Sequence, residues 1–173
     1  MLPIPENQSV ARNITIEIDR NEQHPFIFPE QVVWSPRPRR YEMLRIGTER
    51  KVLPFGDYRL KKAPKGCVIE RKMGAKELAH NLLAPVDRQR FQAAWTRFVE
   101  GCSFPVLVIE DSLARFHETP SRTKIRSEDV ALSFWSLIQK QPPHCVIWAG
   151  RLSSTAHRIA FGTQLVRLLM HTT

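Results

Sequence analysis

The sequence predicts an α/β fold in which a mixed central sheet is flanked by helices. Short apolar runs bounded by glycine or proline indicate buried strands, and residues 105–109 are the clearest of them. From residue 75 onward such runs alternate with amphipathic stretches of helical period, whereas the preceding part of the chain shows only strand patterns. A group of strands followed by alternation of helices and strands favours a mixed sheet with helices on both faces.

The N-terminal part is expected to supply several strands. Residues 13–19 alternate apolar and polar side chains, which is typical of a half-buried strand. Residues 34–40 contain two prolines and cannot form a central strand. Residues 41–46 and 49–53, joined by a Gly-Thr pair, predict a hairpin that leads toward Asp57.

The C-terminal part is expected to alternate helices with buried strands. Proline and side chains that can cap a helix set the predicted bounds, with Asp87 and either Ser153 or Ser154 as N-caps. In chain order the predicted elements are a strand around 67–72, helices at 75–83 and 87–100, a strand at 105–109, a polar basic loop at 111–126, a helix at 127–139, a strand at 145–149 and a last helix ending near 170.

Length and composition indicate one domain. The chain has 173 residues and 42% hydrophobic residues, which suits a single core, so we expect a flexible arm at 1–12 and one domain at 13–173. No run is apolar enough for a membrane span, and the N-terminus lacks the pattern of a signal peptide, so we expect a cytoplasmic protein without a membrane partner. The three scattered cysteines predict buried free thiols.

The charge balance favours a polyanionic partner. Lysine and arginine number 26 against 17 acidic residues, which gives a net charge of +9 and attracts the phosphate backbone of nucleic acids. Dispersed histidines argue against a zinc site, and the absence of a glycine-rich phosphate loop argues against a nucleotide cofactor.

Two carboxylates and a lysine carry the strongest functional signal. Asp57 follows a glycine, and Glu70 and Lys72 lie two apart on the next predicted strand, so that their side chains leave the same face. If these strands pair, Asp57 meets Glu70. Two oxygen ligands with room for water suit Mg²⁺ or Mn²⁺, and a neighbouring lysine can orient water or neutralise charge on a phosphate. The alternative is a set of solvated charges at strand ends.

The motif Gly56-Asp57, a spacer and Glu70-Arg71-Lys72 resembles the GDxₙERKx₃D signature of the XPF-type endonuclease domain. Stretches at residues 16–23, 88–91 and 106–110 resemble other parts of that domain in the same order. The resemblance implies a restriction-endonuclease-like fold and a Mg²⁺- or Mn²⁺-dependent DNA endonuclease, with a preference for branched DNA left open. It places Asp57, Glu70 and Lys72 in catalysis.

The resemblance also implies metal and DNA contacts. Asp57 and Glu70 would hold the metal, with Asp19 and Glu22 completing its shell. The DNA-binding residues would be Arg71, Arg88, Arg90, Arg122 and Lys124. A homodimer or a partner subunit would fit a small member of this kind, as would a bacterial or phage setting.

Two departures from the signature keep other functions open. Lys76 stands where the family has its last aspartate, with Glu77 expected to point elsewhere on a helix, and Asn21 stands where the opening motif has arginine. Either Asp19, Glu22 or Glu77 compensates for the missing acid, or metal affinity is weaker. Another alternative is a DNA-binding subunit with weak or no catalysis. A further one is a basic scaffold that binds proteins. Glu110-Asp111, at the end of an apolar strand, lies near the metal site or merely ends the strand.

Overall fold

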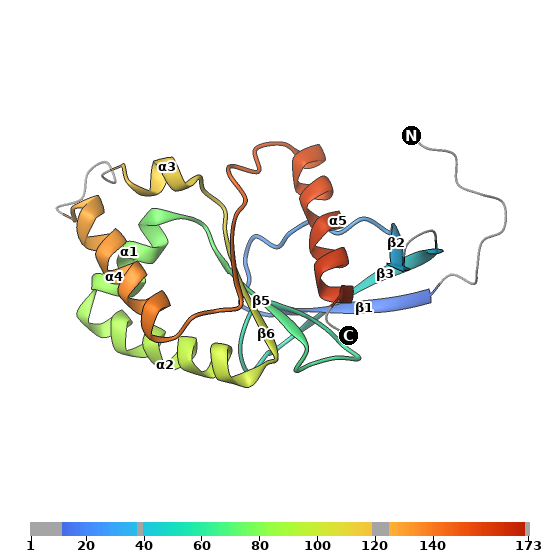
Figure 1. Cartoon of the computed structure of the whole chain (residues 1–173), viewed down its shortest axis with the longest axis horizontal. Helices are drawn as coiled ribbons and strands as arrows, with labels where there is room; N and C mark the ends of the chain where they lie inside the picture. Colours follow the sequence, from blue (N-terminus) through green and yellow to red (C-terminus); the bar gives the residue numbers. More distant parts are fainter. Residues whose placement is uncertain (1–11, 38–39, 119–124, 172–173) are drawn as a thin grey trace.

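Seven strands form one sheet in the order β2-β3-β1-β4-β5-β6-β7. The computed structural model describes residues 12–37, 40–118 and 125–171. Its elements in chain order are β1 (Arg12–Asp19), β2 (Gln31–Arg37), β3 (Arg40–Lys51), β4 (Tyr58–Leu60), β5 (Cys67–Lys72), α1 (Ala75–Leu83), α2 (Pro85–Gly101), β6 (Phe104–Ile109), α3 (Leu113–Phe116), α4 (Ser127–Lys140), β7 (Cys145–Trp148) and α5 (Thr155–His171) (Figure 1).

The sheet is mixed, as predicted. β5, β6 and β7 run parallel to one another, and β1 runs parallel to β3. The short strand β4 is antiparallel to both β1 and β5 and joins the two parallel groups. β2 pairs only with β3 and therefore forms an edge, where its Pro36 is tolerated.

The central strands are buried on both faces, which explains their continuous apolar sequence. Ile69 and Val106 face a core shared with α5, whereas their neighbours Val68 and Leu107 face a second core shared with α1, α2 and α4. Three of these four side chains have no exposed area, and Leu107 is 1% exposed. The helices accordingly cover both faces of the sheet, α5 on one and the other long helices on the opposite one (Figure 1).

Helix α5 touches the backbone of the segment that links β1 to β2. A Cβ atom built at Gly162 would lie 2.1 Å from the carbonyl oxygen of Ile27, so only glycine allows this approach. Phe26 of the same segment is buried between the rings of Tyr58 and Phe161, with centroid separations of 5.2 and 5.3 Å. We refer to residues 20–28 as the β1–β2 link.

The predicted hairpin around residue 47 is wrong. β3 passes straight through Gly47, which pairs with Thr15 of β1 and does not adopt a positive φ. A turn there would leave β1 without its parallel neighbour, and β2 supplies the antiparallel partner on the other side instead.

Helix ends follow the sequence in part. Ser154 Oγ accepts a hydrogen bond from the His157 N–H at 3.1 Å, which confirms the cap of α5. The predicted Asp87 cap is wrong, because α2 already begins at Pro85, the first position where proline is favoured. The predicted loop at 111–126 contains the short helix α3, and residues 119–124 lie outside the described part.

Three smaller predictions concern the rest of the chain. All three cysteines are free thiols, although only Cys67 is buried and the other two are half-buried. Within the described ranges, no helix has the length and apolar character needed to cross a bilayer. Apart from Arg12, which begins β1, the predicted arm at 1–12 falls outside the described residues.

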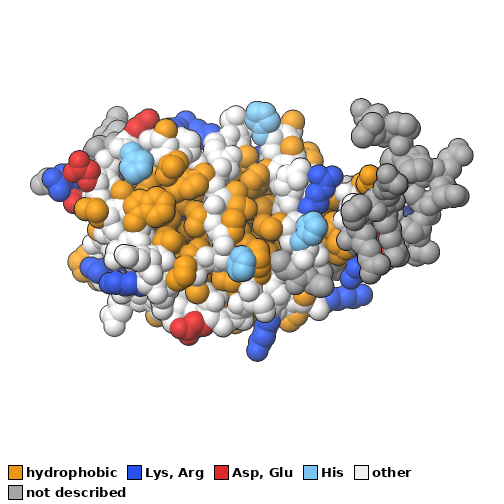
Figure 2. All heavy atoms as spheres, in the orientation of Figure 1, with side chains coloured by type: hydrophobic (Ala, Val, Ile, Leu, Met, Phe, Trp, Pro, Cys, Tyr) orange, Lys and Arg blue, Asp and Glu red, His pale blue; other side chains and the backbone are white. Residues whose placement is uncertain are grey.

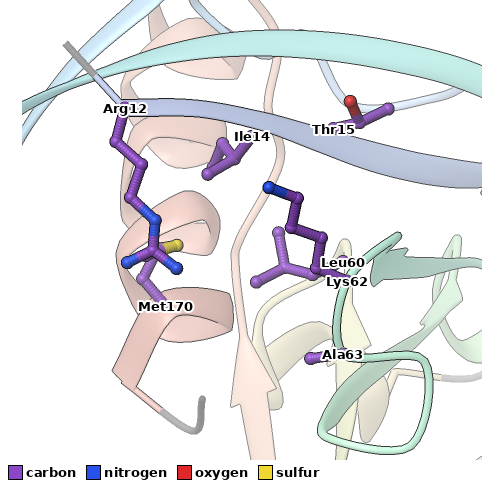
Figure 3. A pocket seen from close by; sticks show the side chains of 7 residues that line it. All are labelled: Arg12, Ile14, Thr15, Leu60, Lys62, Ala63 and Met170. Atoms are coloured by element: carbon purple, nitrogen blue, oxygen red, sulfur yellow. The ribbon is translucent and has the colours of Figure 1, made fainter.

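A small pocket of about 90 Å³ lies at the end of β1 that is remote from Asp19 (Figure 3). Arg12 and Lys62 flank its apolar wall, which includes Ile14, Leu60 and Met170. It is separate from the site described next.

Candidate active site

Four neighbouring strands bring charged side chains to one end of the sheet. β1 ends at Asp19, β5 ends at Lys72, and Glu110 directly follows β6. Because β4 runs antiparallel to β1 and β5, Asp57 at its start lies at the same end. The Asp19 N–H donates to the Asp57 carbonyl at 2.8 Å, and the Asp57 N–H donates to the Ile69 carbonyl at 2.7 Å.

Gly56 allows the chain to enter this crowded end of the sheet. Its φ of 67° is a left-handed conformation that glycine adopts at little cost. A Cβ atom at this position would lie 2.3 Å from Cγ1 of Val68 on β5. The glycine of the motif therefore places Asp57 directly against β5.

Asp57 is an electrostatically unfavourable carboxylate. Burial and the neighbouring charge of Glu70 raise the pKa of Asp57 well above its ordinary value, although Lys72 acts in the opposite direction. Its Oδ2 accepts a hydrogen bond from the Arg71 backbone N–H at 2.7 Å. The two acids of the motif thus interact, and the charge of Lys72 offsets their repulsion only in part.

Lys72 lies between carboxylates. Its Nζ is 2.7 Å from Glu70 Oε1 and 3.3 Å from Glu77 Oε1, and it stands 5.5 Å from the centre of the Phe91 ring. Burial alone would lower the pKa of Lys72, but the charges of Glu70, Glu77 and Asp57 outweigh it and raise that pKa above its usual value. Lys72 is therefore a permanent cation near neutral pH.

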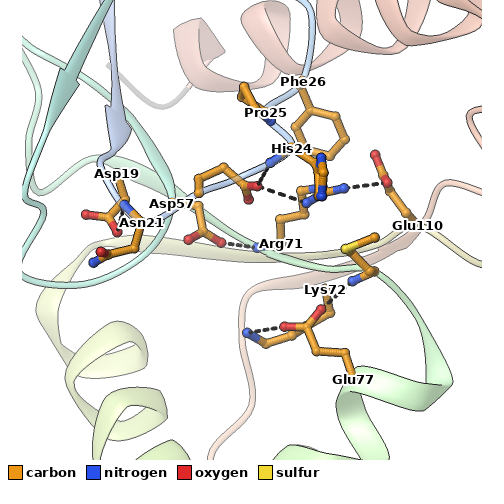
Figure 4. Close-up of polar contacts among 12 residues, drawn as sticks. Asp19, Asn21, His24, Pro25, Phe26, Asp57, Arg71, Lys72, Glu77 and Glu110 are labelled. Carbon is orange, nitrogen blue, oxygen red and sulfur yellow. Dashed lines mark hydrogen bonds and ion pairs between the residues drawn. The ribbon is translucent and has the colours of Figure 1, made fainter.

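Glu77 points into the site, contrary to the sequence-based expectation. It is the third residue of α1, and its Oε2 accepts a hydrogen bond from the Met73 N–H at 2.7 Å while Oε1 faces Lys72 (Figure 4). A glutamate at this helical position can reach back toward the residues before the helix. Lys76, its neighbour, is exposed.

Arg71 belongs to a buried ion network. Its guanidinium is 3.1 Å from Glu22 Oε1 and 2.6 Å from Glu110 Oε2, and it lies over the Phe26 ring (Figure 4). The Arg71 side chain is only 3% exposed. This position does not favour the DNA contact that we expected of Arg71. Arg158 of α5 extends the network, 3.9 Å from Glu110 and bonded to the carbonyl oxygens of residues 24 and 25.

Asp19 stabilises local backbone. Its Oδ1 accepts a hydrogen bond from the Leu53 N–H at 2.9 Å, and its Oδ2 accepts one from the Asn21 N–H at 3.1 Å. The residue is 8% exposed. Asp19 therefore holds the end of β1 to the turn after β3, and both of its oxygens are engaged.

These side chains surround a pocket of about 220 Å³. One wall comes from the β1–β2 link and the other from the end of β5 and the start of α1. The lining residues are Asn21, Glu22, Gln23, His24, Asp57, Arg71, Lys72, Met73 and Glu77. The pocket is open enough for a ligand to approach Asp57, Lys72 and Glu77 together.

Metal binding by the four predicted ligands, Asp19, Glu22, Asp57 and Glu70, stays a prediction. Across the described residues, no group of three or more acidic, histidine or cysteine side chains is arranged to hold a metal ion. Asp19 and Glu22 are committed to the contacts above. The donor chemistry of Asp57 and Glu70 still fits a hard divalent cation, because both offer carboxylate oxygens and a cation would relieve their repulsion. In this structure the Lys72 ammonium, next to Glu70, provides the positive charge that a bound cation would supply.

The predicted surface cations lie elsewhere. Arg88 and Arg90 are exposed on α2, where Arg90 pairs with Asp87 at 3.1 Å. Arg88 lines a groove of about 250 Å³ toward α4. Arg122 and Lys124 lie outside the described residues. DNA contacts by these four side chains stay a prediction.

Sequence reasoning missed Arg158 and the orientation of Glu77 as parts of this region, and it left the place of Glu110 open. A signal existed for Glu110, because the ends of neighbouring parallel strands meet at one edge of a sheet. No local pattern marks Arg158, which reaches the network only through the packing of α5.

Comparison with known proteins identifies the domain. The sequence matches the ERCC4 domain over residues 18–167. Two solved structures of XPF from Aeropyrum pernix share the fold, one of them in complex with DNA. Their TM-scores are 0.52 and 0.53 at 16% and 18% sequence identity, over 88% of this chain in each case. The chain spans 61% and 64% of the length of those solved chains. No curated protein sequence matches it.

The family match includes the whole motif from Gly56 to Lys72, the last two residues of β1 and every other strand of the sheet. It confirms the resemblance on which the predicted fold was based. This chain therefore belongs to the ERCC4 domain family and has the restriction-endonuclease-like fold of an XPF-type nuclease domain.

Proposed function

We propose that this domain is a divalent-metal-dependent DNA endonuclease that hydrolyses phosphodiester bonds, with Asp57, Glu70 and Lys72 in the reaction. The observation that carries this proposal is the combination of two interacting carboxylates with a permanently charged lysine beside an open pocket, in a domain of the ERCC4 family. Cleavage of branched DNA in particular is the finer form of the proposal.

Asp57 and Glu70 would hold Mg²⁺ or Mn²⁺. When bound, such an ion supplies Lewis-acid polarisation of the phosphate and a more acidic water. The chain itself contributes the excess negative charge that favours the cation: burial prevents water from screening Asp57, and Glu70 adds a like charge.

Lys72 acts in this proposal as a cation and not as a base. In the metal-free protein the charges of Glu70, Glu77 and Asp57 raise the pKa of Lys72, which favours its charged form. Its ammonium can stabilise the negative charge that develops on the phosphate oxygens in the transition state. Glu70 and Glu77 hold Nζ toward the pocket for that role.

Affinity for DNA would come from the basic surface. The net charge of +9 attracts phosphates, and the solved XPF complex with DNA supports a nucleic-acid ligand for this fold. The exposed Arg88 and Arg90, with Arg122 and Lys124, would contact the backbone and not the bases.

A DNA-binding subunit without strong catalysis is the second candidate. It is favoured by Lys76 in place of an acid and by the lack of a three-ligand group in the described part of the chain. Such a subunit, or a homodimer, needs an interface. Leu132 and Trp135 of α4 are 70% and 43% exposed. In Figure 2, further apolar side chains gather at the surface between α4 and α5. Light scattering of the protein with and without Trp135→Glu tests that interface.

The deciding experiment is a cleavage assay with duplex, flap, fork and junction DNA in Mg²⁺, in Mn²⁺ and in EDTA. We expect metal-dependent nicking that is lost in Asp57→Ala and Glu70→Ala, with DNA affinity equal or higher because a charge that repels phosphate is gone. Binding without cleavage by the unaltered protein would favour the second candidate. Cleavage that persists in either variant would overturn the assignment of the site.

A further inference from the structure

The site has one acidic side chain that the family signature does not assign. Position 76, where the signature has its last acid, carries an exposed lysine. The next residue, Glu77, lines the same pocket as Asp57 and Lys72. Its side chain is 37% exposed, so solvent and ions reach it.

The other acids near the pocket are already engaged. Asp19 accepts backbone hydrogen bonds on both oxygens. Glu22 is 7% exposed, pairs with Arg71 and accepts the His24 N–H at 2.8 Å. Glu110 also pairs with Arg71, at 2.6 Å. Glu77 differs from all three, because its one charged partner among the described residues is the lysine of the site itself.

The start of α1 explains how Glu77 comes to face the pocket. Gly74 has a φ of 127°, and a Cβ atom at this position would lie 2.8 Å from Oδ2 of Asp111, so glycine is favoured between β5 and α1. The helix then begins at Ala75, which places its third residue over the end of β5 and leaves Lys76 outside.

We propose that Glu77 supplies the third carboxylate of this active site, replacing the acid that the signature has at position 76. The proposal rests on the proposed function and adds a residue to it. Glu77 Oε1 and Glu70 Oε1 lie 3.3 and 2.7 Å from the same atom, Lys72 Nζ. Both oxygens therefore face one position at which a positive charge is stabilised. A divalent cation at the site would be attracted by the same two side chains.

The competing explanation is structural. Glu77 Oε2 accepts the Met73 N–H, a contact that stabilises the start of a helix without any ligand. Glu77→Gln separates the two explanations, because glutamine keeps a carbonyl oxygen for the Met73 N–H but loses the charge. Lys76→Asp is the matched variant, since it adds an acid at the neighbouring exposed position.

The test measures Mn²⁺ binding to the protein without DNA, by calorimetry or electron paramagnetic resonance. Thermal unfolding is measured separately without metal. We expect Glu77→Gln to raise the dissociation constant for Mn²⁺ by about tenfold or more and to leave the metal-free melting temperature nearly unchanged. Lys76→Asp should leave the dissociation constant within about twofold, as its side chain points out of the pocket.

Equal Mn²⁺ affinity in Glu77→Gln and the unaltered protein would overturn this inference, as would a clear gain in affinity from Lys76→Asp. Neither result would contradict the proposed endonuclease activity. If instead Glu77→Gln weakens Mn²⁺ binding while no DNA is cut, the inference stands and the proposed activity fails. An unaltered protein that binds no Mn²⁺ would overturn both.

Discussion

Arg71 Nη2 and Glu110 Oε2 lie 2.6 Å apart in a nearly solvent-free part of the protein, linking the ends of β5 and β6. Arg71, the arginine of the motif, therefore has a structural role at the site. Removing one partner of a buried ion pair leaves an uncompensated charge, which is strongly destabilising.

We therefore expect Arg71→Met to lower the free energy of unfolding by about 3–5 kcal/mol, because both Glu22 and Glu110 lose their partner. Urea denaturation measures this loss. Arg88→Ala is the control, since that side chain is exposed on α2 and should change stability by no more than about 0.5 kcal/mol. Similar stabilities for the two variants would contradict a structural role for Arg71.

Asp57→Asn should increase stability while it abolishes cleavage. At neutral pH the buried carboxylate is destabilised by desolvation and by Glu70, and the neutral amide removes both effects. We expect a gain in the free energy of unfolding, measured by urea denaturation without metal.

The gain in stability from Asp57→Asn should depend on pH. A folded-state pKa that is raised means that stability is highest below the unfolded-state value of about 4 and declines as the pH rises toward the folded-state value. The advantage of Asp57→Asn should therefore grow between acidic and neutral pH. Added Mg²⁺ should raise the melting temperature of the unaltered protein and not that of the variant.

Lys72→Arg should keep a substantial part of the activity, whereas Lys72→Met should lose about 10²-fold or more in turnover. Arginine remains charged at every accessible pH and can serve as a cation but not as a base. The measurement is single-turnover cleavage at saturating DNA. Equal loss in both variants would point to a proton-transfer role for the lysine.

Glu17→Gln should remove a pH-dependent contribution to stability. Glu17 is 2% exposed and lies opposite Arg59 in the β1–β4 ladder, 2.7 Å from its Nε and 3.0 Å from Lys51 Nζ. Burial alone would raise the pKa of Glu17, but Arg59 and Lys51 outweigh it and lower that pKa. The resulting stabilisation is present above the unfolded-state pKa of about 4.3 and is lost as the pH falls through the folded-state value.

We expect Glu17→Gln to cost about 3 kcal/mol at neutral pH and to flatten the acid limb of the stability curve. Glu49→Gln is the matched control on β3. Its pair with Lys61 is exposed, at 42% and 53%, and such pairs contribute about 1 kcal/mol or less. An unchanged acid limb in Glu17→Gln would exclude this residue as its source.

The sequence predicted the fold where local pattern and tertiary context agree. Strands such as β6 are apolar throughout because they are buried on both faces, and Asp57 meets β5 because Gly56 permits the turn. The hairpin at Gly47 was wrong because a glycine in a strand looks like a turn until its partner strands are known. Glu77 was misjudged because helix phase depends on where α1 begins, and Gly74 sets that by its backbone conformation. The buried state of Arg71 depends on α5 and Glu110, which lie far from it in sequence.

The contact of Gly162 with Ile27 determines how a substitution in α5 would affect the pocket. Helix α5 contributes no residue to the pocket. It nevertheless fixes the position of the β1–β2 link, which forms one wall of the pocket and carries Glu22. A single added methyl group at position 162 would collide with the Ile27 carbonyl and displace that wall of the pocket. The shape of the pocket can thus be altered from a helix that does not line it, through steric fit alone.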